Sequence, residues 1–381
     1  MTEATSRTWL QEFAATAEGT DRFAGKPDHA ALLAAGLIGE AGSVIAELKK
    51  ERREREAYPV YRHRMLEEVG DFLWYFTRLA ALVTPGLLDE LQGEDAAADP
   101  ATSGPRLPAF LDFGAAVGDV LASINRLSAN DLESRLRRVW ALLIGVAQDA
   151  GVSLREAAER NTDKTKSRWP SAKHHRALFD DDFPEEEQLP RRLQVEFRER
   201  SRGPQKVVLL RCNSINFGDR LTDNIEDPDG YRFHDIFHFA YAVHLGWSPV
   251  VRALMRSKRK SRSDIDEAQD GARAAILEEA VAAIVFSRAK QLKFFEGLDH
   301  VDFDLLKTVK EFVEGFEVAD VPLWQWEAAI LDGYRVFRAL RDGGGGCVAL
   351  DLVERQLTYS PRVEQAERVK PGLLGSSQGS T

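Results

Sequence analysis

Acidic side chains recur at helical spacing within residues 36–82, next to strongly apolar positions. Glu40 and Glu47 are seven residues apart, so a helix would place them on one face, two turns from each other. Glu68 and Asp71 are three residues apart and would be neighbours on a second helix. Two antiparallel helices that opposed these faces would gather several carboxylates, which is costly unless cations neutralise them. Because Mg²⁺ prefers oxygen donors completed by water and substrate phosphates, the pattern indicates a magnesium site.

Solvated faces of ordinary amphipathic helices have the same spacing, and for acidic residues alone this interpretation is favoured. Glu67 is the weaker ligand candidate, because it lies about 100° around the helix from Glu68. The magnesium hypothesis therefore needs support from the rest of the sequence.

A second group of metal-binding residue types begins in residues 231–245. His234 and His238 are four residues apart, so both imidazoles can reach one metal from one helical face, and Asp235 lies between them. With Glu279, further along the chain, they form a candidate second metal site of a separate hydrolase. Partly buried histidines bonded to carboxylates are the alternative. A peptidase of the HExxH type is not favoured, because Asp in place of Glu shortens the reach of the general base.

The bulk composition fits a cytoplasmic protein of two domains, since 381 residues exceed what one core usually holds. No secretion signal and no membrane-spanning window is expected. Cys212 and Cys347 are too few for a disulfide framework. The net charge of −10 argues against nucleic acid as a partner. The basic run in residues 256–262 is interpreted either as a solvated loop or as a local nucleotide contact.

The first half predicts an all-α bundle, residues 1–172, with a loop insertion at about 87–108. Ser153 and Glu156 have the spacing of a capping box at the start of its last helix. Apolar residues at helical spacing mark the expected helices, which cover residues 7–23, 30–56, 60–83, 110–127, 132–150 and 154–170.

The second half predicts a mostly helical domain with a small β-hairpin, residues 191–360. A polar, proline-punctuated linker, residues 173–190, precedes it, and a flexible tail, residues 361–381, follows it. The hairpin is expected at 193–213 and one last strand within 348–359. The expected helices cover residues 233–245, 249–256, 268–295, 305–316 and 322–340. The fold class is therefore mainly α.

The stretches GLIGEAGSVIAELKK and LEEVGDFLWYFTRLAAL resemble the MazG-type all-α nucleoside triphosphate pyrophosphohydrolases, whose hallmark is an ExxE pair followed by an ExxD pair. The resemblance covers roughly residues 7–170, and the second half resembles the C-terminal domain attached to some MazG-type proteins. It implies that Glu40, Glu68 and Asp71 hold Mg²⁺, or Mn²⁺ in its place. The implied reaction is hydrolysis of a (deoxy)nucleoside triphosphate to monophosphate and pyrophosphate.

One position departs from the hallmark: the second acid of the ExxE pair falls on Ser43. Glu47, one turn further on, would substitute for it, or the site would bind one metal fewer or be inactive. A catalytically weakened nucleotide sensor is therefore the rival hypothesis. A homo-oligomer is expected, because bundles of short helices usually complete their cores by pairing.

The nucleoside triphosphate needs cationic partners for its phosphates. Asn161 is the candidate for hydrogen bonds to base or sugar, and Lys49 and Lys50 also suit the C-terminal end of a helix for reasons unrelated to ligand binding. The candidate phosphate contacts are Lys49, Lys50, Lys164 and Arg168.

Overall fold

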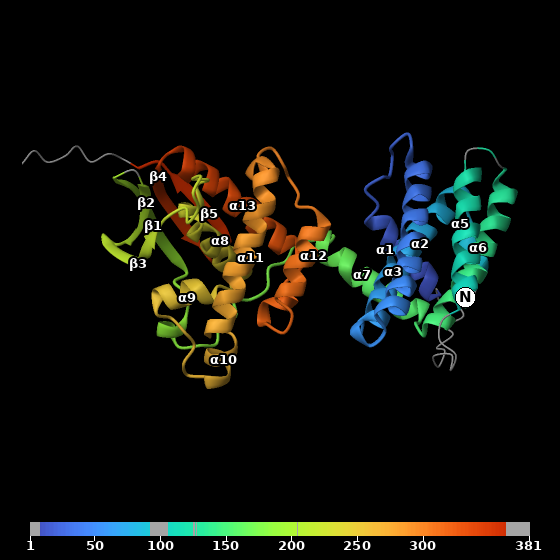
Figure 1. The fold of residues 1–381 in the computed structure, drawn as a ribbon, viewed down its shortest axis with the longest axis horizontal. Helices are drawn as coiled ribbons and strands as arrows, with labels where there is room; N and C mark the ends of the chain where they lie inside the picture. The colour runs from blue at the N-terminus through green and yellow to red at the C-terminus, as the bar shows by residue number, and fades with distance from the viewer. Residues whose placement is uncertain (1–7, 92–105, 125, 127, 204, 363–381) are drawn as a thin grey trace, which may run out of the picture. The chain divides into compact units, whose positions relative to one another are not determined.

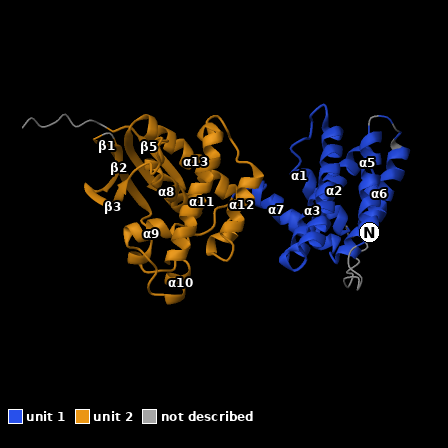
Figure 2. Cartoon of the chain, in the orientation of Figure 1, with its two compact units in different colours: residues 1–173 blue, residues 174–381 orange. Residues whose placement is uncertain are grey.

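The computed structural model describes residues 8–91, 106–124, 126, 128–203 and 205–362. The chain forms two compact units, residues 1–173 and 174–381 (Figure 2). Each unit has its own hydrophobic core. Helices dominate both units and the second contains one small sheet, so the predicted mainly α fold class is confirmed (Figure 1).

Unit 1 is a helical bundle whose helix ends follow sequence signals. The Thr8 hydroxyl and the Gln11 side chain form a capping box at α1. Ser153 caps α7 through the backbone N–H of Glu156, while the Glu156 carboxylate pairs with Arg62 instead of closing the predicted box. The helices are α1 (Trp9–Gly19), α2 (His29–Glu54), α3 (Tyr61–Val83), α4 (Leu87–Glu90), α5 (Leu107–Ser123), α6 (Ala129–Ala150) and α7 (Leu154–Arg168).

The predicted insertion at 87–108 begins with α4 and ends inside α5, and its residues 92–105 lie outside the described residues. The core of unit 1 gathers around α3, which contacts α1, α2, α6 and α7. A side chain at Gly70 would place its Cβ 2.6 Å from the carbonyl oxygen of Ala157. Glycine at this position therefore allows α3 and α7 to lie unusually close together.

Helix α2 departs from one expectation of the sequence. Among the described residues, the helical stretch His29–Ala57 is long and apolar enough to cross a membrane, with a mean hydropathy of 1.6 over its 18-residue window. The prediction of no such window is therefore wrong. The stretch is weak evidence for a membrane segment, because Leu33, Leu37 and Val44 lie in the core of unit 1 and core helices have the same composition.

The sheet of unit 2 is larger than the predicted hairpin. The hairpin itself is present as β1 (Arg192–Arg202) and β2 (Gln205–Cys212). β3 (Ile215–Leu221) extends it on one side, and β4 (Gly345–Asp351) pairs with the other edge of β1, for example Val195 with Val348. The single predicted last strand is two strands, β4 and β5 (Gln356–Ser360), joined by a turn. The order is β3-β2-β1-β4-β5, with every pair antiparallel.

Helix α8 forms the centre of unit 2, and each of its residues is buried. It packs closely on α13, where Gly333 lies beside Ala240. Figure 1 shows these helices next to the sheet. The helices are α8 (Asp235–Leu245), α9 (Pro249–Met255), α10 (Ser263–Ala268), α11 (Ala272–Gln291), α12 (Phe303–Phe312) and α13 (Leu323–Asp342), with the short 3-10 turn Tyr231–Phe233 before α8.

The segment predicted as a linker is part of unit 2. Asp180 is fully buried and accepts hydrogen bonds from the backbone of Leu189 and from the guanidinium groups of Arg191 and Arg252, all at 2.7–2.8 Å. The polar composition of residues 174–190 thus serves internal ion pairs. Of the predicted tail, residues 363–381 lie outside the described residues.

The basic run in residues 256–262 is only partly a solvated loop. Arg259 is buried and pairs with Asp270 and Glu317. Its guanidinium therefore forms ion pairs inside unit 2 and is not exposed to bind a nucleotide from solution.

Candidate functional site

The acidic residues of unit 1 meet between α2 and α3. Glu40 comes from α2, and Glu68 and Asp71 come from one turn of α3. Their carboxylate oxygens lie within 4.8 Å of one another, and all three side chains are partly exposed. We call this set the acidic cluster. The distances between the three carboxylates would allow one divalent cation to bind an oxygen of each. Because the side chains are partly exposed, water or substrate could fill the other coordination positions.

The electrostatics of the acidic cluster favour a cation. Burial raises the pKa of Glu40, and the nearby carboxylates of Asp71 and Glu68 add to the effect, so that the pKa reaches about 7. Loss of hydration and repulsion by the neighbouring carboxylates therefore both disfavour the ionised form of Glu40. A divalent cation bound by the three carboxylates would remove the repulsion, so the residues present fit Mg²⁺.

Helix α7 brings polar side chains to the same place. The Asn161 amide donates a hydrogen bond of 2.6 Å to Asp71 Oδ1, and Lys164 forms an ion pair with the same oxygen. Both contacts depend on the close approach of α7 at Gly70. Asn161 is 4% exposed, and its Oδ1 has no hydrogen-bond partner among the described residues. Two predicted substrate-binding residues thus reach the acidic cluster.

Glu47, the predicted substitute for the missing acid at Ser43, has partners outside the acidic cluster. Its carboxylate is buried and accepts short hydrogen bonds from the Tyr58 hydroxyl and from Lys50. Both oxygens are therefore used within the bundle, and the predicted role of Glu47 as a metal ligand is not supported by its contacts. Ser43 itself is half-buried and contributes no charge.

The other predicted phosphate contacts lie differently. Lys49 is exposed, and Lys50 pairs with Glu47. Arg168 is buried, with its guanidinium 4.8 Å from the centre of the Trp169 ring. Of the predicted substrate-binding residues, Asn161 and Lys164 are the two shown above to contact the acidic cluster, both through Asp71.

Tyr75 is a neighbour of the acidic cluster that the sequence pattern did not identify. Burial raises its pKa, and Glu40 and Asp71 add to this effect. A Cβ at Gly36 would lie 2.1 Å from the Tyr75 ring, so the absence of a side chain there makes room for the tyrosine. The only sequence signal was a glycine on the inner face of a helix, one turn before Glu40.

The second predicted group is also assembled, entirely within unit 2. The ligand atoms of His234, Asp235 and His238 lie within 4.8 Å of one another, and all three residues are buried. Glu279, from α11, lies 3.4 Å from His238 Nε2 and 4.0 Å from His234 Nε2. We call these four residues the histidine cluster.

The charges of the histidine cluster are strongly coupled. Burial opposes the charged form of His238, but the carboxylates of Glu278 and Glu279 outweigh it and raise its pKa to about 10. Burial lowers the pKa of His234 and raises that of Asp235. Without a cation, the excess of carboxylates therefore holds a proton on His238.

The chain thus combines a mainly α fold with a carboxylate cluster between two bundle helices. Residues 174–363 match the MazG C-terminal domain family, and this range begins with unit 2 and covers most of it. The match supports membership of the MazG family. The match does not extend into unit 1. Comparison with curated proteins gave no match, and comparison with solved structures gave none.

Proposed function

We propose that unit 1 hydrolyses (deoxy)nucleoside triphosphates to monophosphate and pyrophosphate with Mg²⁺ as cofactor. The observation that carries the proposal is the convergence of Glu40, Glu68 and Asp71 within 4.8 Å, with the pKa of Glu40 raised to about 7. The match of the same chain to the MazG C-terminal domain family supports a function of the nucleotide pyrophosphohydrolase type. Mg²⁺ held by these carboxylates supplies charge neutralisation for the phosphates.

The side chains of unit 1 have separate tasks in this reaction. The acidic cluster would hold and orient the water that attacks phosphorus, and the proton of that water would pass to a carboxylate of the cluster or to solvent. The bond broken joins the leaving pyrophosphate to the nucleoside monophosphate. Lys164, which pairs with Asp71 in the absence of ligand, turns to the phosphates, while Asn161 stays to hydrogen-bond the nucleotide.

The direct test is release of pyrophosphate from a panel of ribo- and deoxyribonucleoside triphosphates with Mg²⁺. Wild-type protein is expected to turn over at least one of them, and Glu68→Ala is expected to lose the activity. Glu67→Ala is the matched control, since Glu67 pairs with Arg64 one turn back on α3. No turnover with any triphosphate, or equal turnover in Glu68→Ala and wild type, would contradict the proposal.

A nucleotide sensor is the second candidate, and two observations favour it. Ser43 supplies no carboxylate, and Asp71 is already engaged by Lys164 and Asn161. Calorimetric titration would show nucleotide binding without hydrolysis in this case. Gain of turnover in Ser43→Glu would then locate the defect at the missing acid.

A further inference from the structure

The histidine cluster of unit 2 has the construction of a metal site that differs from the acidic cluster. We infer that His234 Nε2, His238 Nε2 and the carboxylates of Asp235 and Glu279 bind one divalent transition metal ion. The inference concerns unit 2 alone, and it is independent of any nucleotide hydrolysis in unit 1.

The first argument is the orientation of the two imidazoles. His234 Nδ1 is bonded to the carbonyl oxygen of Tyr231 at 2.9 Å, and His238 Nδ1 to Glu278 Oε1 at 2.8 Å. Because each Nδ1 faces an oxygen acceptor, each Nε2 is the nitrogen left to ligate a metal, which on binding would displace the proton that His238 otherwise holds. Metal-bound histidines are held in this way by carbonyl or carboxylate groups behind them.

Glu278, the residue behind His238, is itself fixed. It is fully buried and also accepts hydrogen bonds from the Ser248 hydroxyl at 2.6 Å and from the backbone of Val250 at 2.9 Å. Ser248 and Val250, at the start of α9, therefore fix the Glu278 carboxylate, and this carboxylate in turn fixes the His238 ring. His234 is the N-cap residue of α8, one turn before His238. Such support limits the movement of both imidazoles.

The second argument is a polar atom without a partner. His238 is 0% exposed, and its Nε2 makes no hydrogen bond of acceptable geometry among the described residues, although Glu279 Oε1 lies 3.4 Å away. His234 Nε2 lies 3.3 Å from Asp235 Oδ1. Ligand atoms about 2.1 Å from a tetrahedral ion are about 3.4 Å apart. The separations thus fit ligands around a shared ion better than direct hydrogen bonds.

The ligand types select the kind of metal. Two imidazoles with carboxylates suit zinc, manganese or iron, whereas Mg²⁺ prefers oxygen donors alone. The histidine cluster therefore favours metals that accept nitrogen ligands, whereas the all-oxygen acidic cluster suits Mg²⁺. The side chain of Glu279 is 46% exposed while the other three ligands are buried, so the ion would meet water or a substrate oxygen on the side of Glu279.

The test uses the full chain carrying Glu68→Gln, which weakens metal binding at the acidic cluster, after removal of metals with a chelator. Co²⁺ alone is the probe, because its visible absorption becomes strong when the ion leaves octahedral water for a four- or five-coordinate protein site. One equivalent per chain is expected to give this absorption. Glu279→Gln is expected to weaken the binding at least tenfold without loss of fold, since the side chain is half exposed.

Removal of an imidazole should have the larger effect. His234→Ala is expected to abolish the absorption, and Glu278→Gln to weaken Co²⁺ binding about 10- to 100-fold by releasing His238. His244→Gln is the matched control: His244 is also buried and bonded to a carboxylate, Asp332, at 2.9 Å, but it lies outside the cluster. Circular dichroism checks the fold of each variant.

Three outcomes would overturn the inference. They are absence of strongly absorbing Co²⁺ in the full chain, unchanged binding in folded Glu279→Gln and His234→Ala, and an equal loss in His244→Gln. Because unit 1 is already disabled by Glu68→Gln, none of these outcomes depends on whether unit 1 hydrolyses nucleotides.

Discussion

Glu40 carries an unfavourable charge in the absence of a cation. Its pKa is raised from 4.5 to about 7 by burial and by Asp71 and Glu68. A carboxyl group with a raised pKa in the folded state costs stability as the pH rises from 4.5 through 7, because the unfolded chain releases the proton first. We expect Glu40→Gln to raise the melting temperature of unit 1 by about 2–4 °C at pH 8 in chelator. The gain should be much smaller at pH 5, close to the unfolded pKa, and calorimetry at both pH values checks it.

Glu47→Gln is the control for this prediction, because Glu47 lies on the same helix but is bonded to Tyr58 and Lys50. Loss of a charge-assisted bond to a buried carboxylate should cost about 1–3 kcal/mol, with or without Mg²⁺. A Glu40→Gln variant that is destabilised in the same way would show that Glu40 has a structural role and would count against the magnesium site.

The contrast between Glu40 and Glu47 also shows what the residue pattern could predict. Helical spacing predicted that Glu68 and Asp71 are neighbours on one helix, and the family resemblance added Glu40 from the other helix; the three lie within 4.8 Å of one another. The spacing also placed Glu47 on the face of Glu40, but Tyr58, beyond the end of α2, bonds to its carboxylate. A partner supplied from another segment cannot be found from periodicity.

At the scale of elements, the contact of α3 with α7 determines whether Asn161 and Lys164 reach Asp71. Gly70→Ala would place a Cβ 2.6 Å from the Ala157 carbonyl oxygen and force the helices apart. We expect a loss of about 1–3 kcal/mol in stability and a larger proportional loss of pyrophosphate release. Thermal unfolding and the activity assay measure the two effects.

Gly39→Ala is the matched substitution, because a Cβ at Gly39 on α2 would meet nothing within 4 Å. It should leave activity intact and stabilise the helix by up to about 1 kcal/mol. If Gly70→Ala retained full activity despite a lowered melting temperature, the position of α7 would not matter for catalysis.

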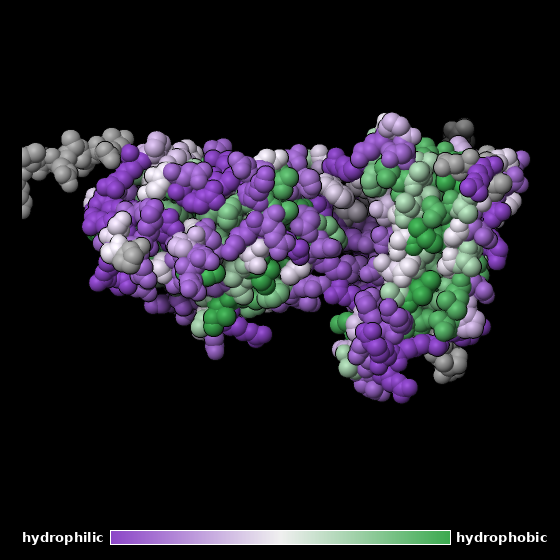
Figure 3. Space-filling view, turned by 45° about the horizontal axis from the view of Figure 1, so that its top comes forward, coloured by the Kyte–Doolittle hydropathy of each residue, from purple (hydrophilic) through white to green (hydrophobic). Residues whose placement is uncertain are grey.

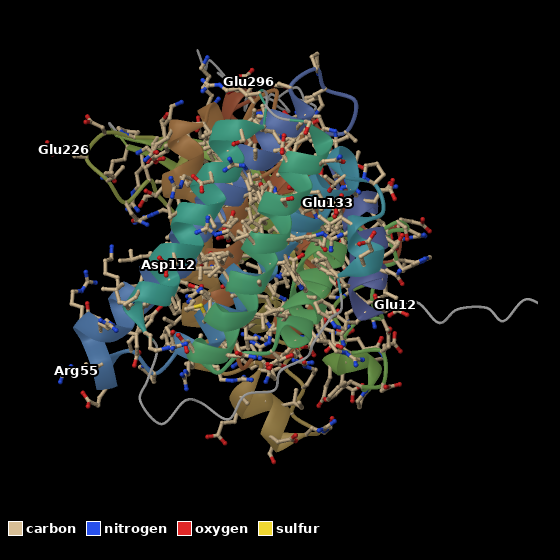
Figure 4. The ribbon with its side chains drawn as sticks, turned by 90° about the vertical axis from the view of Figure 1, so that its right-hand side faces the viewer. Glu12, Arg55, Asp112, Glu133, Glu226 and Glu296 are labelled. Carbon is tan, nitrogen blue, oxygen red and sulfur yellow. The ribbon has the colours of Figure 1, made fainter. Side chains whose placement is uncertain are left out.

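Helices α2 and α5 carry an apolar face that unit 1 leaves uncovered. Leu107, Leu111 and Leu121 of α5 are exposed, with Leu111 at 54%, and Ala35 of α2 is exposed as well. Figure 3 shows a broad hydrophobic area on unit 1. The charged end of α2, marked by Arg55 in Figure 4, is polar by contrast.

We expect this face to bury itself against a second copy of the chain, in line with the homo-oligomer predicted from sequence. Leu111→Glu should shift the protein toward the monomer in sedimentation velocity. Ile276→Glu, at a still more exposed position of unit 2, should leave the oligomeric state unchanged. A protein that is monomeric at all concentrations would contradict the prediction.

At the scale of the whole molecule, local composition located the helices better than the boundaries between parts. Residues 174–190 look like a linker because they are acidic and contain proline, yet Asp180 lies in the interior with arginines more than ten residues away. Likewise, β4 pairs with β1, although most of the sequence of unit 2 lies between the two strands. Both features depend on contacts between distant segments, which the sequence pattern does not show.

Two separate cores and two chemically different clusters predict that the units respond to different metals. Ligand that binds only the folded state raises stability by RT ln(1 + [L]/Kd), or about 2.7 kcal/mol at 100 times Kd. We expect calorimetry of the full chain to show two transitions, one raised by Mg²⁺ with a nonhydrolysable triphosphate and the other by Zn²⁺. Glu68→Gln should abolish only the first shift, and Glu279→Gln only the second. A single transition that responds to both ligands, or loss of both shifts in either variant, would show that the two clusters do not act as independent sites.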